Sequence, residues 1–211
     1  MSSTTSRTRR ALASTTAKLS ITAAAGAMAV GMGLAAASGA SAATSGPEPF
    51  SFALQASPGI SACLPHASGR VTITPGKLND TMRVSVRGLP ARTGFDLFVI
   101  ETPNKPFGVS WYQSDLNTGR HGNGTATVRG IFDRETFSVS IPGSATPFAA
   151  THQYHLGLWF NNPNTPFRLG CEPGATTAAV TPFNGEQHAG IQVLNTAEFP
   201  DNAGPLSHVH R

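Results

Sequence analysis

Proline and glycine interrupt this 211-residue chain so often that a helical fold is difficult to build from it. The chain contains 16 prolines and 22 glycines, and beyond residue 42 no window of a dozen residues avoids them while showing helical periodicity. Apolar and polar residues alternate instead with a period of two, which is typical of strands with one solvated face. The sequence therefore predicts an all-β fold.

Seven or eight short strands separated by turn residues are expected. Residues 82–86 alternate between apolar and polar side chains, whereas residues 95–100 are apolar on nearly both faces and are expected in the centre of a sheet. Further strands are expected at 71–73, 126–132, 137–141, 154–160 and 191–194. The pattern predicts an antiparallel β-sandwich of immunoglobulin-like or jelly-roll kind and leaves the strand order open.

The first 42 residues have the features of a secretory signal peptide. A basic segment over residues 7–18 precedes an uncharged stretch rich in alanine and glycine, and residues 40–42 form an A-x-A cleavage site. A retained membrane helix is the alternative, but few residues of the stretch are strongly apolar. We therefore expect cleavage after Ala42 and a secreted, extracellular protein with no membrane association after cleavage. The paired arginines leave general and twin-arginine export open.

Removal of this leader would change the charge balance. The whole chain has a formal net charge of +4, and four of its 15 basic residues, but none of its 11 acidic residues, lie in positions 1–42. Fifteen basic residues less four leaves 11, which balances the 11 acidic residues of positions 43–211. The basic character of the full chain is therefore no indication of nucleic-acid binding, and no nucleic-acid partner is expected.

The remaining length is sufficient for one domain with a hydrophobic core. We expect an N-terminal extension over residues 43–62, a β-sandwich domain over residues 63–199 and a C-terminal tail over residues 200–211. The tail has few apolar residues to pack and is expected to be loose.

The chain has two cysteines, Cys63 and Cys171. In an oxidising compartment they are expected to form one disulfide. Two separate reactive thiols are the alternative, and His66 near Cys63 is the single sequence feature in favour of it.

One short sequence occurs twice. Pro-Asn-Lys-Pro-Phe at 103–107 and Pro-Asn-Thr-Pro-Phe at 163–167 each follow an expected apolar strand. We interpret them as structurally equivalent corners in which Phe107 and Phe167 pack on the core. Chance recurrence in a proline-rich chain is the alternative.

Three segments resemble exported β-sandwich proteins of actinobacteria. They are Trp-Tyr-Gln-Ser-Asp at 111–115, His-Gly-Asn-Gly at 121–124 and Gly-Ile-Gln-Val-Leu-Asn-Thr at 190–196. The alanine-rich leader fits the same group. The resemblance implies a compartment and no mechanism, because the group has no established activity.

No catalytic or metal-binding signature is present in the sequence. G-x-S-x-G, H-E-x-x-H, C-x-x-C and P-loop motifs are missing, so no cofactor is expected. Residues 115–119 follow the D-x-N-x-G rhythm of calcium loops but lack a later acidic residue to complete the shell. An extracellular hydrolase or metal-dependent enzyme with scattered site residues remains the alternative. Its candidate residues are His121, His152, His155, Asp115 and Asp133.

Aromatic side chains are the candidate ligand-facing groups. Trp111, Tyr112 and Trp159 are of the type that stacks on sugar rings, and His155 shares a strand face with Trp159. A core position is the alternative for Trp159. We expect a non-enzymatic extracellular binding module whose partner is a cell-wall polysaccharide or another secreted protein. A structural surface-layer component is a third alternative.

Overall fold

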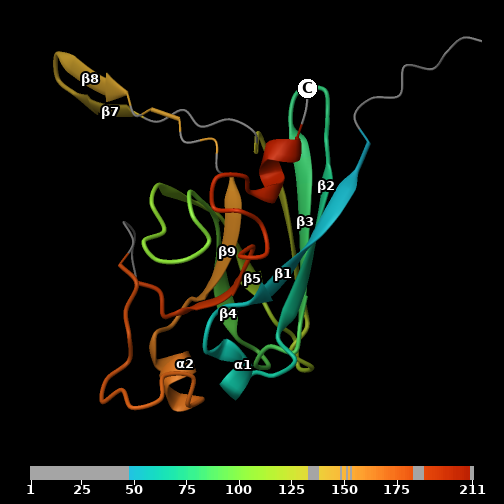
Figure 1. Cartoon of the computed structure of the whole chain (residues 1–211), viewed down its shortest axis with the longest axis vertical. Helices are drawn as coiled ribbons and strands as arrows, with labels where there is room; N and C mark the ends of the chain where they lie inside the picture. Colours follow the sequence, from blue (N-terminus) through green and yellow to red (C-terminus); the bar gives the residue numbers. More distant parts are fainter. Residues whose placement is uncertain are drawn as a thin grey trace, which may run out of the picture. The chain divides into compact units, whose positions relative to one another are not determined.

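The computed structural model of the chain describes most of its residues from position 48 onward (Figure 1). The described residues are 48–132, 138–147, 149–150, 152, 154–182 and 188–209. Residues Ala43–Arg211 form one compact unit. The expected leader, Asp133 and the start of the strand expected at 137–141 lie outside the described residues.

Eight antiparallel strands form one continuous sheet. Its order is β5-β4-β9-β10-β1-β2-β3-β6. The strands are β1 (Phe50–Ala56), β2 (Ser68–Thr74), β3 (Asp80–Arg87), β4 (Gly94–Ile100), β5 (Ser110–Asn117), β6 (Gly124–Gly130), β9 (His155–Phe160) and β10 (Gln192–Asn195). A separate hairpin contains β7 (Ser138–Ile141) and β8 (Ser144–Pro147). The short helices are α1 (Ile60–Cys63), α2 (Asn164–Arg168) and the 3-10 turn η1 (Pro205–His208).

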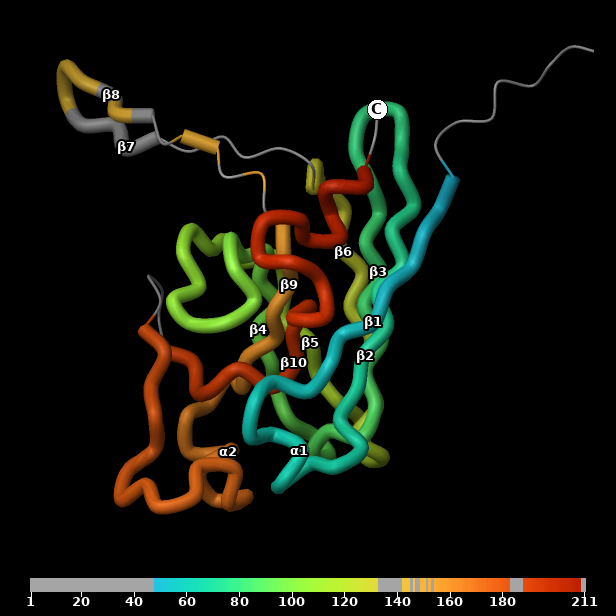
Figure 2. The backbone as a smooth tube through the Cα atoms, in the orientation of Figure 1, coloured from blue at the N-terminus to red at the C-terminus, as the bar shows by residue number. Residues whose placement is uncertain are grey.

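Strand β1 joins two layers of strands, whose backbones can be followed in Figure 2. Residues 50–54 of β1 pair with β2, whereas Gln55 and Ala56 pair with β10. One layer, called sheet A, contains β1, β2, β3 and β6. The other, sheet B, contains β5, β4, β9 and β10. The β5–β6 turn, closed by the Thr118–Gly124 bridge, links the two layers again at their far edges.

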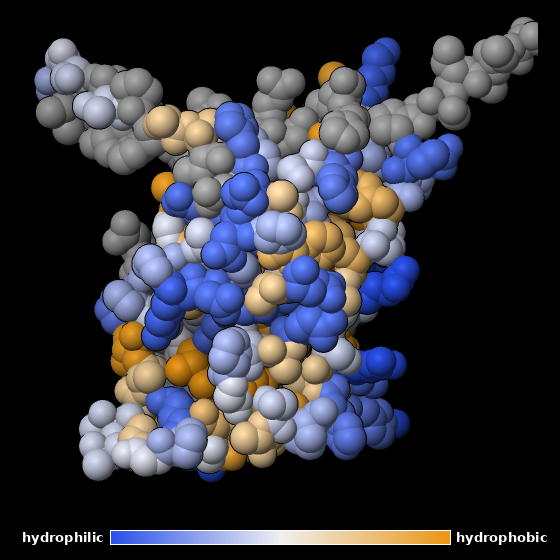
Figure 3. Space-filling view, viewed as in Figure 1, coloured by the Kyte–Doolittle hydropathy of each residue, from blue (hydrophilic) through white to orange (hydrophobic). Residues whose placement is uncertain are grey.

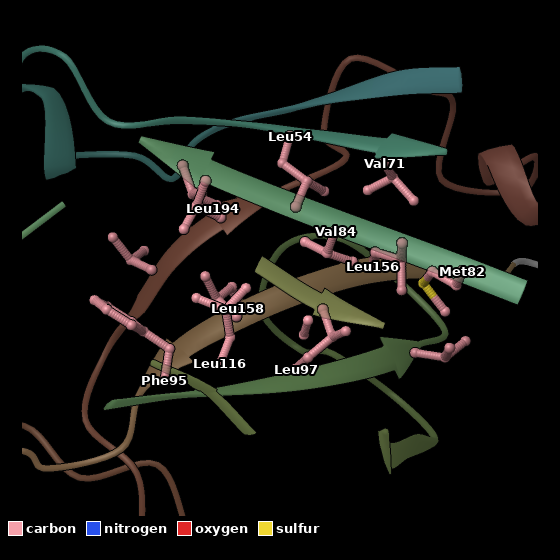
Figure 4. Packing of buried hydrophobic residues seen from close by; sticks show 14 of the residues in the cluster. Leu54, Val71, Met82, Val84, Phe95, Leu97, Leu116, Leu156, Leu158 and Leu194 are labelled. Carbon is pink, nitrogen blue, oxygen red and sulfur yellow. The ribbon is translucent and has the colours of Figure 1, made fainter. Parts of the chain in front are cut away.

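The hydrophobic core lies between the two sheets and comes from one face of each strand (Figure 4). Met82, Val84 and Val86 of β3 are buried, while the residues between them face outward. Strand β4 is buried from Phe95 to Ile100 on both faces. The predicted all-β sandwich class is therefore confirmed, with eight strands in the main sheet. Residues 95–100 lie inside that sheet, between β5 and β9, as expected.

The predicted disulfide is confirmed. Cys63 at the end of α1 bonds to Cys171, three residues after α2, with the Cα atoms 5.1 Å apart. Figure 1 shows α1 and α2 at the same end of the sandwich. The bridge therefore ties the β1–β2 connection to the segment that follows β9.

Both ends of the domain differ from the expected boundaries. The segment expected as an extension over 43–62 contains β1. Phe52 and Leu54 of this strand are buried, and the residues next to them are more exposed, as in the other strands. The tail expected to be loose over 200–211 contains η1, and Leu206 and Val209 are buried in the core. The backbone N–H of Leu206 donates to the Tyr154 carbonyl at 3.3 Å. A few apolar residues at the right spacing were enough to anchor the tail.

The two copies of the repeated pentapeptide are not equivalent. Residues 103–107 form an irregular loop, and Phe107 packs on Trp159 with ring centroids 4.9 Å apart. Residues 164–167 of the second copy form most of α2. The interpretation of equivalent corners is wrong, because the same residue types adopt a loop in one context and a helix in the other.

Candidate binding site on the outer face of strands β4, β5 and β9

Two carboxylates lie opposite each other on the outer surface of sheet B. The register of β4 and β5 pairs Asp96 with Asp115, and the register of β4 and β9 places Trp159 on the other side of Asp96. The neighbouring residues in β4, Phe95 and Leu97, point into the core. Since side chains alternate along a strand, Asp96 must face outward.

Tyr112 lies on the same outer face because the pairing of β4 with β5 is irregular. The pairing shifts between Leu97 and Phe98, which brings Tyr112 opposite Phe98. The two rings meet edge to face with centroids 5.7 Å apart. The Tyr112 hydroxyl donates a 2.8 Å hydrogen bond to Asp115 Oδ1, and its side chain is 53% exposed. The phenol ring is thus fixed at two points and still faces solvent.

Two amides complete the arrangement. Asn161 Nδ2 donates to Asp96 Oδ1 at 2.9 Å. A Cβ atom at Gly94 would lie 3.3 Å from Asn117 Oδ1 and 3.5 Å from Asn161 Cβ, so the missing side chain of Gly94 leaves room for both amides. We call the group Asp96, Tyr112, Asp115, Asn117 and Asn161 the β5 patch.

The environment of the β5 patch shifts two pKa values. Burial raises the pKa of Asp96, the negative charge of Asp115 raises it further, and the hydrogen bond from Asn161 opposes the shift. Burial raises the pKa of Tyr112 to about 12, helped by the hydrogen bond to Asp115 and by its charge. Tyr112 therefore remains a neutral hydrogen-bond donor at any physiological pH.

The structure places the four aromatic candidates very differently. Trp159 is 1% exposed, its ring lying over Gly157 and against Phe98 and Phe107. His155 is fully buried, and Trp111 is half-buried against the main core. Tyr112 is the exposed member of the four. The burial of Trp159 therefore supports the alternative of a core position.

A buried polar network holds the loop that covers Trp159. Gln192 Nε2 and Asn195 Nδ2 both donate to the Pro103 carbonyl, at 3.1 and 3.0 Å. Ser57 Oγ and Asn195 Nδ2 donate to Gln192 Oε1, each at 2.9 Å. Because buried polar groups are costly without partners, this closed set positions the 101–109 loop over the outer face of β9.

Among the described residues of the alternative enzyme interpretation, His152 and His155 contact different partners, and Asp133 lies outside the described residues. His155 Nδ1 contacts Thr196 Oγ1 at 2.9 Å, and its Nε2 contacts the Pro200 carbonyl at 3.1 Å, away from Asp115. His152 is exposed and contacts the Tyr154 hydroxyl at 2.8 Å. Across the described ranges, no group of three or more His, Cys, Asp or Glu side chains is arranged to hold a metal ion.

Sequence reasoning missed Asp96 and Asn161, although both contribute to the β5 patch. The available signal was Asp96 itself, the one charged residue in the apolar run of β4. A charge at such a position needs a partner or a function. Its neighbours, however, come from two other strands, and the strand order was not predictable.

Comparisons with known proteins add no family assignment. No protein-family model, curated protein or solved structure matches the chain. Within the part of the chain that the structure describes, no helix has the length and apolarity needed to cross a membrane.

Proposed function

We propose that the chain is an extracellular, non-enzymatic binding module and that the β5 patch binds a neutral polysaccharide. The observation that carries the proposal is the exposed Tyr112 ring, held by Asp115 beside Asp96 and Asn161. A fixed aromatic ring offers an apolar face to the C–H groups of a sugar at little cost in conformational entropy.

The polar groups of the β5 patch suit sugar hydroxyls. Carboxylates accept hydrogen bonds, and the Asn117 and Asn161 amides both donate and accept them. Asp115 is exposed on edge strand β5, so an extended polymer can reach it from solvent. The local negative charge disfavours an acidic ligand at this position.

An extracellular setting is supported by three features. The Cys63–Cys171 disulfide is typical of proteins that mature in an oxidising compartment. The sequence of residues 1–42 also predicts a cleavable export signal, and the resemblance to exported actinobacterial proteins implies the same address.

The test is retention of purified protein (residues 43–211) on insoluble chitin, cellulose and peptidoglycan. We expect retention on at least one of them, and a loss of about tenfold in affinity for Tyr112→Ala, because anchoring aromatics dominate such contacts. Leu78→Ala is the control, since Leu78 is 81% exposed and lies in the β2–β3 turn, outside the β5 patch. Failure to bind all three polymers, or equal binding by both variants, would contradict the proposal.

Glycoside hydrolysis is the second candidate function. The observation in its favour is the pairing of Asp96 and Asp115 on adjacent strands, with the pKa of Asp96 raised as a general acid requires. Release of reducing ends from the retained polymer, abolished in Asp115→Asn, would establish this activity. Binding without any release would leave the binding module as the function.

A further inference from the structure

The outer face of sheet A differs in character from the β5 patch. The outward-facing positions of β2, β3 and β6 hold only serine, threonine and arginine. Four of them are arginines with exposed side chains: Arg70, Arg83, Arg87 and Arg129. We call these four residues the arginine face. Figure 3 shows hydrophilic atoms along the right-hand edge, where β2 and β3 lie in Figure 1.

Three of these arginines form a diagonal line across the sheet. On one side, Arg83 lies opposite Thr72 of β2, which is two residues from Arg70 in that strand. On the other side, Arg83 lies opposite Thr127 of β6, which is two residues from Arg129. Diagonal neighbours on adjacent strands are about 7–8 Å apart. The line Arg70–Arg83–Arg129 therefore presents positive charge at regular intervals over three strands.

A groove lies at one end of this line. It has a volume of about 500 Å³, and Arg70, Arg87, Ser68 and Ser85 are among the residues that line it. Arg87 Nε donates to Ser68 Oγ at 3.0 Å, which fixes one guanidinium on the rim. Its remaining N–H groups, and those of Arg70, are available to a ligand as planar donor pairs.

No described carboxylate forms an ion pair with Arg70, Arg83 or Arg129. Glu198 lies near the groove, since its Oε2 accepts a 3.0 Å hydrogen bond from Gln55 at the rim. Residues 43–211 contain equal numbers of acidic and basic side chains, yet Asp96 and Asp115 lie on the outer face of the opposite sheet. The arginine face therefore carries a local positive potential, although the formal charges of residues 43–211 balance.

We propose that the arginine face binds a linear acidic polysaccharide. Guanidinium groups pair with carboxylates in bidentate geometry, and the surrounding hydroxyls suit the uncharged groups of a sugar chain. The face carries no aromatic ring on which nucleic-acid bases could stack. The outward strand positions of this face also hold no large apolar side chain that could enter a membrane, and the exposed Leu78 and Ile131 lie beyond the strand ends.

The test measures affinity for polygalacturonate, with neutral dextran as the negative control polymer. The variant is Arg70→Gln/Arg83→Gln, and the matched control is Lys105→Gln/Arg168→Gln, which removes the same charge from exposed positions off sheet A. We expect the first variant to lose at least about tenfold in affinity, because charge-assisted hydrogen bonds are removed, and the control to stay within about twofold. Added salt should weaken wild-type binding.

No binding of polygalacturonate by the wild type, or equal losses in both double variants, would overturn the proposal. Tighter binding of duplex DNA or of anionic phospholipid vesicles than of polygalacturonate would also overturn it and identify another class of partner. Tyr112→Ala should leave polygalacturonate binding unchanged. The arginine face and the β5 patch can therefore fail or succeed independently.

Discussion

Asp96 is a buried carboxylate whose surroundings disfavour its charged form. It is 8% exposed and lies between Asp115 and Trp159, and Asn161 donates a hydrogen bond to it. Burial of a carboxylate beside a second carboxylate is unfavourable for the ionised form. Such a residue weakens the fold at neutral pH, which is common for groups kept for function rather than stability.

We expect Asp96→Asn to be more stable than the wild type at pH 7. The pKa of Asp96 is raised above its ordinary value of 3.8, so its contribution to stability falls as the pH rises through 3.8 towards the folded-state pKa. The amide of the variant keeps an oxygen for Asn161 and carries no charge. Thermal unfolding of both proteins at pH 7 and below pH 3.8 measures the difference in stability. The advantage of the variant should vanish at the lower pH. A less stable variant at pH 7 would contradict the assignment.

For His155 we expect stability to depend on pH in the opposite direction. Burial lowers its pKa below the ordinary 6.5, although contacts with the Asp201 and Pro200 carbonyls oppose the shift. The unfolded chain therefore binds the proton more readily, and stability should decline as the pH falls below about 6.5 towards the lowered pKa. Urea unfolding at pH 7.5 and 5 tests this. An identical pH response in His155→Gln would show that another group is responsible.

At the scale of elements, alternation predicted some strands well and others poorly. Strands β3, β4 and β9 were expected at nearly their observed places, because each presents a continuous apolar face to the core. Strand β5 was not expected, since Leu116 is its one fully buried side chain and the rest is polar or aromatic. Neighbouring strands, rather than its own pattern, make it a strand.

The binding site was predictable to a smaller extent than the fold. Tyr112 was among the expected ligand-facing residues, and it is exposed. Trp159 and His155 were further ligand-facing candidates, with a core position as the alternative for Trp159. The 101–109 loop covers Trp159, and the chain around 196–201 covers His155. Which loop covers which strand depends on tertiary contacts far apart in sequence, which no local pattern reveals.

The turn η1 should contribute strongly to stability despite its position near the end of the chain. Leu206 is completely buried, so Leu206→Ala should lower the free energy of unfolding by about 2–5 kcal/mol. Leu78→Ala, at an exposed position, should change it by less than about 0.5 kcal/mol. Urea denaturation of the two variants makes the comparison. Equal stabilities would mean that the segment around η1 does not pack on the core in solution.

At the scale of the whole molecule, the Cys63–Cys171 bridge spans 108 residues and most of the sandwich. Cross-linking so long a loop restricts the unfolded chain. The double variant Cys63→Ser/Cys171→Ser should therefore lose about 2–5 kcal/mol of unfolding free energy. Wild-type protein in a reducing agent should approach the same value. A variant as stable as the oxidised wild type would show that the bridge is dispensable.

The two proposed surfaces lie on the outer faces of different sheets. The β5 patch belongs to sheet B and the arginine face to sheet A, with the core between them. If both surfaces bind as proposed, one molecule contacts two polymers of different charge at the same time. Such a protein would connect components of an extracellular matrix without any chemical step.

Amide chemical-shift mapping of ¹⁵N-labelled protein (residues 43–211) with chitohexaose, cellohexaose and soluble peptidoglycan fragments tests the central claim most directly. We predict that at least one of them perturbs amides of residues 110–117 and of Asp96 and Asn161, and leaves those of β2 and β3 unchanged. Perturbations confined to residues outside the β5 patch, or none with any of the three, would contradict the assignment of this surface as the binding site.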